Sequence, residues 1–149
     1  MRTTIRDIRV EAPLDIVFDF LVDPHNLPEI WPTIVEVKNV KKSKNNAGFN
    51  FNWAYKMADI QLEGKCESIE YIPYQSLVTK SNKGLDSTIT WRFNSAGQNT
   101  HVTLKFEYQP PASALKQTEE EVLAAENERE VEAVLQNLKN RLELQLSHV

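Results

Sequence analysis

The stretch Phe49-Asn-Phe-Asn-Trp-Ala-Tyr-Lys-Met57 carries a large apolar side chain at every odd position and Asn, Ala or Lys at every even position. Alternation with a period of two is typical of a β-strand with one buried face and one solvent-facing side. Four of the five odd side chains are aromatic, and burial of each contributes about 1.5–3 kcal/mol. Such a strand forms either the centre of a core or the wall of an apolar pocket, and its own residues fit both.

The same period continues on both sides of this stretch and predicts a sheet. Runs of β-branched and aromatic residues between turn-forming residues predict strands at 3–11, 34–43, 49–58, 60–71, 76–82, 86–94 and 100–109. Connections after the second strand are short, so consecutive strands there should be antiparallel neighbours. The 60–71 strand switches the parity of its apolar positions after Ser68, which predicts a bulge. Its Gly64 predicts a bend or the close approach of another segment.

Helical spacing occurs in three places. Pro13 favours the start of a helix that Asp23-Pro24 ends, and residues 25–31 predict a second, short one. A capping-box pattern at Thr118 and Glu121 predicts a helix over 118–147, with an earlier start near Ser113 as the alternative. Its inward stripe reads Leu123, Asn127, Val131, Val134, Leu135, Leu138, Leu142, Leu146. The predicted architecture is α+β, in the order β-α-α-β6-α, as one domain over 1–149, with about seven antiparallel strands curved around the last helix.

Composition excludes several classes of function. The net charge is −4, from 21 acidic and 17 basic residues, whereas nucleic-acid binders usually carry a basic face. The single cysteine, Cys66, is expected to be buried and structural, and His25, His101 and His148 show no metal-ligand spacing. No cofactor motif, signal peptide or membrane span is recognisable. The predictions are therefore no metal, no cofactor, no nucleic acid, no stable membrane insertion and a cytoplasmic location.

Several stretches together resemble a known superfamily. They are Glu11–Pro24, Asn26–Pro32, Trp53–Met57, Thr90-Trp91 and Leu135–Glu143. In this order and spacing they are similar to the helix-grip superfamily of START-like domains (SRPBCC), and nearest to its polyketide cyclase/dehydrase and lipid-transport group. The resemblance implies an apolar cavity between the sheet and the C-terminal helix, entered near the two short helices. Members of this superfamily carry lipids, bind hormones, cyclise polyketides or assist chaperones.

The inward aromatic side chains exceed what one helix can cover, since a helix contacts a band about 10 Å wide. A cavity is therefore expected, and a fully packed core is the alternative. Trp31 either caps the mouth of the cavity or packs the second helix. The predicted ligand-binding residues are Trp31, Phe51, Trp53, Tyr55, Leu62, Ile89, Trp91, Phe93, Asn127 and Val131.

Three functions follow as hypotheses. The first is binding or carriage of a small hydrophobic, lipid- or polyketide-like molecule. The second is a cyclase or dehydratase that acts on an aromatic polyketide-like substrate, with Tyr55, Tyr108 and Asn127 as candidate catalytic residues. The third is a protein-interaction module. The apparent shortage of inward-facing ionisable residues favours the first hypothesis over the second.

Overall fold

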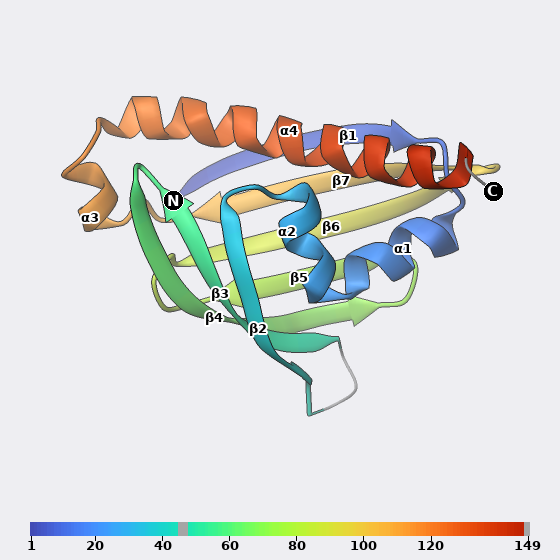
Figure 1. Cartoon of the computed structure of the whole chain (residues 1–149), viewed down its shortest axis with the longest axis horizontal. Helices are drawn as coiled ribbons and strands as arrows, with labels where there is room; N and C mark the ends of the chain where they lie inside the picture. Colours follow the sequence, from blue (N-terminus) through green and yellow to red (C-terminus); the bar gives the residue numbers. More distant parts are fainter. Residues whose placement is uncertain (45–47, 148–149) are drawn as a thin grey trace.

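The seven strands form one antiparallel sheet in the order β1-β7-β6-β5-β4-β3-β2 (Figure 1). The computed structural model describes residues 1–44 and 48–147. The strands are β1 (Arg2–Val10), β2 (Ile34–Lys42), β3 (Phe49–Met57), β4 (Ile60–Ile72), β5 (Ser76–Ser81), β6 (Ser87–Ala96) and β7 (Asn99–Tyr108). Every strand end lies within two residues of its predicted position. The predicted turn at 45–47 and His148 lie outside the described residues.

The helices cover one face of this sheet. They are α1 (Leu14–Val22), the 3-10 helix η1 (Pro24–Asn26), α2 (Leu27–Ile30), α3 (Ala112–Leu115) and α4 (Glu120–Ser147). Helix α4 runs lengthwise beside β1, and α1 and α2 lie over the rest of the face (Figure 1). This is the helix-grip architecture, and the predicted element order is confirmed apart from α3. The chain near Ser113 forms that separate short helix, and α4 begins two residues after Thr118.

Aromatic side chains connect the helices to the sheet. Trp31 lies 5.5 Å from Phe106 between ring centroids, Phe106 lies 6.2 Å from Tyr55, and Tyr55 lies 5.2 Å from Trp53. The inward direction predicted for the odd positions of β3 is confirmed from Phe51 to Met57, which are all at most 7% exposed. In β1 the even positions face α4 instead, so Ile5, one of its apolar positions, is 52% exposed.

A loop between β5 and β6 fills part of the concave face. The predicted bulge in β4 is confirmed by a register shift between Ser68 and Glu70. The predicted close approach at Gly64 is also confirmed, because a Cβ atom there would lie 2.0 Å from the carbonyl oxygen of Lys83. The loop that carries Lys83 places the fully buried Leu85 in the core. The interior is therefore occupied by the chain's own side chains over much of the sheet.

Candidate functional site

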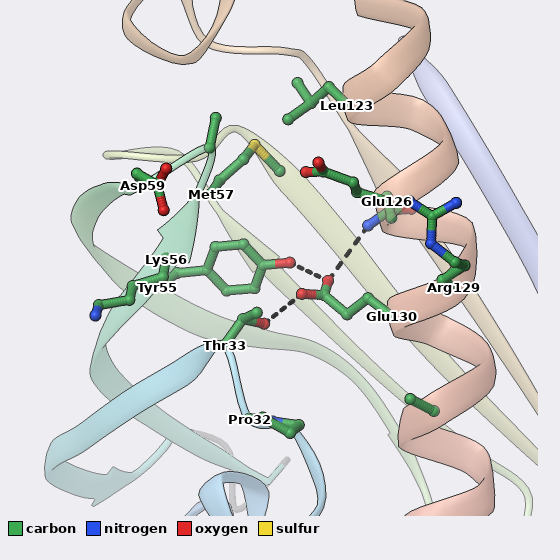
Figure 2. Close-up of a pocket in the computed structure, with 13 residues that line it drawn as sticks. Pro32, Thr33, Tyr55, Lys56, Met57, Asp59, Leu123, Glu126, Arg129 and Glu130 are labelled. Atoms are coloured by element: carbon green, nitrogen blue, oxygen red, sulfur yellow. Dashed lines mark hydrogen bonds between the residues drawn. The ribbon is translucent and has the colours of Figure 1, made fainter. Parts of the chain in front are cut away.

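An open pocket of about 530 Å³ lies between α4 and the end of β3 (Figure 2). Tyr55 and Glu130 form its polar end, and Met57 and Leu123 supply apolar wall. Its rim consists of exposed residues: Lys56, Asp59, Glu126, Arg129 and Ala133. The size falls within the range of about 300–1,000 Å³ that is usual for small-molecule sites.

Three side chains donate hydrogen bonds to the Glu130 carboxylate. The Tyr55 hydroxyl donates to Oε2 and the Thr33 hydroxyl donates to Oε1, while Asn127 Nδ2 lies 3.4 Å from Oε2. The fold brings these groups together in two ways. Lys56 N donates to Thr33 O at 2.8 Å, which fixes the start of β2 beside Tyr55. Asn127 and Glu130 lie three residues apart on α4, so they share one face of the helix.

Asn127 is itself held in one orientation. Thr4 on β1 donates a buried hydrogen bond of 2.9 Å to Asn127 Oδ1. Since the amide oxygen accepts from Thr4, the amide nitrogen is the atom left to face Glu130. The first strand of the sheet thus positions a donor in the pocket.

Burial shapes the electrostatics of the site. It raises the pKa of Glu130 above its ordinary value, and the hydrogen bonds from Thr33 and Tyr55 oppose that rise. The pKa of Tyr55 is raised well above its ordinary value by burial and by the adjacent negative charge of Glu130. The indole N–H of the fully buried Trp31 lies close enough to lower the pKa of Glu130, although it makes no hydrogen bond of good geometry. A carboxyl group in such surroundings can exchange a proton with a bound molecule more readily than a fully solvated one.

The predicted ligand-binding residues lie in several places. Tyr55 and Asn127 meet in the pocket. Phe51, Ile89 and Trp91 line a second void of about 40 Å³ beneath α1 and η1, which is roughly the space of one water. The others lie elsewhere: Trp31, Phe93 and Val131 in the core, Leu62 partly buried against it, and Trp53 beside a groove near Glu63. Tyr108 is buried against Phe106, 5.4 Å away between ring centroids.

Glu130 and Thr33 are the residues that sequence reasoning missed. The prediction that inward ionisable residues are lacking is wrong, because Glu130 lies partly buried beside Tyr55. A signal was present: Glu130 follows Asn127 by three residues and precedes Val134 by four, both on the predicted inward stripe. Thr33 carried no comparable signal, since it lies between a helix and a strand.

Comparison with known proteins agrees with this fold. The family model described as polyketide cyclase/dehydrase and lipid transport matches residues 1–143. The chain belongs to this family. No curated protein sequence matches the chain. Within the part of the chain that the structure describes, no helix is both long and apolar enough to cross a membrane.

Solved structures share the fold of this polyketide cyclase/dehydrase and lipid-transport family member at low sequence identity. The Zhui aromatase/cyclase from Streptomyces sp. R1128 has a TM-score of 0.77 at 18% identity, over 97% of this chain and 95% of that one. A START superfamily protein from Mycobacterium smegmatis has a TM-score of 0.75 at 12% identity, over 96% and 98%. The protein TTHA0849 from Thermus thermophilus has a TM-score of 0.73 at 18% identity, over 97% and 99%. At these identities the likeness concerns the fold alone.

Proposed function

We propose that this protein binds a small, mainly apolar molecule in the pocket between α4 and the end of β3. The observation that carries the proposal is the contrast between the two spaces in the fold. The pocket at Tyr55 has about 530 Å³, whereas the void beneath α1 has about 40 Å³. A molecule of drug-like size fits the first space and is far too large for the second.

The polar end of the pocket fixes the orientation of the ligand. Tyr55, Thr33 and Asn127 hold the Glu130 carboxylate in place through the contacts described above. A polar group of the ligand meets this cluster, and the apolar part lies against Met57 and Leu123. Burial of apolar surface supplies the affinity, at about 25 cal/mol per Å².

Acid–base catalysis is the second candidate, and Glu130 is the observation that favours it. Burial raises the pKa of this carboxyl group, and Tyr55 donates to it. In a cyclase or dehydratase, Glu130 would take a proton from the carbon next to a substrate carbonyl, while a neighbouring hydroxyl positions the substrate. The printed description of the family and the aromatase/cyclase among the solved structures support this candidate.

Binding is tested by native mass spectrometry of freshly purified protein and by thermal shifts with a panel of hydrophobic molecules. A ligand at 100 times its Kd should add about 2.7 kcal/mol to the free energy of unfolding. Ala133→Trp places a large side chain at the exposed rim of the pocket and should abolish the shift. The matched control is Gln136→Trp, an exposed position on α4 outside the pocket. Equal binding by both variants would place the ligand elsewhere.

Catalysis is tested separately with Tyr55→Phe and Glu130→Gln on aromatic polyketide-type substrates. Retained binding with lost turnover in Glu130→Gln would indicate proton transfer by this group. Unchanged turnover in both variants would exclude the Tyr55–Glu130 pair from the chemistry.

A further inference from the structure

We infer that the polar end of the ligand is a protonated amine, so that the pocket takes an apolar or aromatic body that carries one positive charge. This inference rests on the binding function proposed above and names the chemical class of its ligand. It follows from the hydrogen-bonding groups that the pocket leaves free and from the charge that it leaves unpaired.

The hydroxyl hydrogens at the polar end are already used. Tyr55 and Thr33 each have one hydroxyl hydrogen, and each gives it to Glu130. The oxygens of these hydroxyls and of the carboxylate therefore present lone pairs to a ligand. The Trp31 N–H is a donor, but it is fully buried beside the same carboxylate. A ligand at this end meets mainly acceptors, so its own polar group must donate.

The charge of Glu130 lacks a counter-ion within the described residues. Its carboxylate forms no ion pair with Lys, Arg or His there, and the groups that lower its pKa are all neutral donors. In Figure 2, Lys56 extends away from the Tyr55–Glu130 pair, and Arg129 lies on the side of Glu130 away from Tyr55. A partly buried charge without a counter-ion favours a cation over a neutral donor, because charge-assisted hydrogen bonds are about twice as strong as neutral ones.

Two more carboxylates lie near the path into the pocket. Glu126 projects from α4 toward the open space, and Asp59 lies at the turn on the opposite side (Figure 2). Both are exposed, so each contributes little by itself. Together with Glu130 they make the local potential negative, which favours the entry of a cation and opposes the entry of a fatty acid or another anion.

The apolar lining accounts for the rest of the molecule. Met57 is 7% exposed and Leu123 is 2% exposed, and both border the pocket. A thioether and a branched alkyl group suit a flat or irregular hydrocarbon body. A simple inorganic cation gains nothing from this surface, and no group of three or more metal-ligating side chains was found among the described residues.

The test uses three probes that share one body: 2-naphthylmethylamine, 2-naphthylmethanol and 2-naphthoate. Their affinities for the full chain are measured by titration calorimetry near neutral pH. The amine should bind at least about tenfold more tightly than the alcohol, and the carboxylate should bind most weakly. In Glu130→Gln, the affinity for the amine should fall about tenfold, while that for the alcohol changes by less than about threefold.

Each outcome bears on one proposal. An alcohol or carboxylate that binds wild type as tightly as the amine would overturn the inference and leave the binding function standing. An amine affinity unchanged in Glu130→Gln would also overturn it. Failure of all three probes to bind, together with a thermal-shift panel that gives no hit, would contradict the proposed function itself. Thermal melting of Glu130→Gln shows that the variant is folded, and Ala133→Trp, which should lose all three probes, confirms the location.

Discussion

Thr4 Oγ1 lies 2.9 Å from Asn127 Oδ1 in a buried hydrogen bond that joins the first strand to the last helix. The two residues are 123 positions apart in the sequence. Because this bond orients the Asn127 amide, it also sets the donor that Asn127 presents to Glu130. An edge strand that carries no ligand-binding residue of its own therefore controls the pocket.

Thr4→Val should test this connection. Valine keeps the shape of threonine but leaves the buried Asn127 oxygen without a donor, so the free energy of unfolding should fall by about 1–2 kcal/mol. Chemical denaturation measures this loss. The matched control is Thr3→Val, because Thr3 is exposed on the opposite face of the same strand and should change stability by less than about 0.5 kcal/mol. Equal effects at both positions would contradict a specific role for the buried bond.

Glu130→Gln should change the pH dependence of stability. Burial raises the pKa of Glu130 above 4.5, so the folded protein keeps this proton to higher pH than the unfolded chain does. Its contribution to stability is complete below pH 4.5 and is lost as the pH rises through the folded pKa. The variant should therefore gain stability relative to wild type between pH 4.5 and about pH 7.

Urea denaturation of both proteins across this range measures the difference. A constant difference would show that the carboxyl group titrates alike in the folded and unfolded states. Loss of binding combined with a gain in stability at neutral pH would be typical of a residue kept for function.

Gly64→Ala should be strongly destabilising, because its Cβ would overlap the Lys83 carbonyl oxygen at 2.0 Å. Either the β5–β6 loop or β4 must move, at a cost of about 1–3 kcal/mol or more. Gly97→Ala is the control: its φ of +68° strains an alanine, but nothing lies within 4 Å of the added Cβ. Its cost should be about 1 kcal/mol, from the backbone conformation alone. Thermal melts of the two variants separate overlap from backbone strain.

Cys66 should be inert in the folded protein. Its side chain is 1% exposed, and burial raises the pKa of the thiol far above its ordinary value. Since the thiolate is the reactive form, labelling with a thiol-specific reagent should be complete in denaturant and very slow in native buffer. Rapid labelling of the native protein would mean that β3 and β4 separate readily.

The strands could be predicted because their evidence is local. Alternation from Phe49 to Met57 and the parity switch after Ser68 each depend on a few adjacent residues, and the structure has the strand and the bulge there. The pocket depends on distant residues instead. Glu130 pairs with Tyr55 across 75 positions and with Thr33 across 97, so periodicity in one segment could not place them together.

The filling of the interior was hidden for a similar reason. The number of inward aromatic residues indicated surplus apolar surface, which is correct. What covers part of that surface is the loop that carries Leu85, and its path depends on the absence of a side chain at Gly64. A turn pattern predicts that a loop exists but not the side of the sheet over which it folds.

The exposed rim of the pocket has a kinetic consequence. Lys56, Asp59 and Glu126 face solvent, so a molecule can enter from water without displacement of a lid or a helix. Association then needs no conformational step, and its rate should vary little from one ligand to the next. Selection among ligands falls to their residence times, so a chosen compound is one that leaves slowly rather than one that arrives quickly.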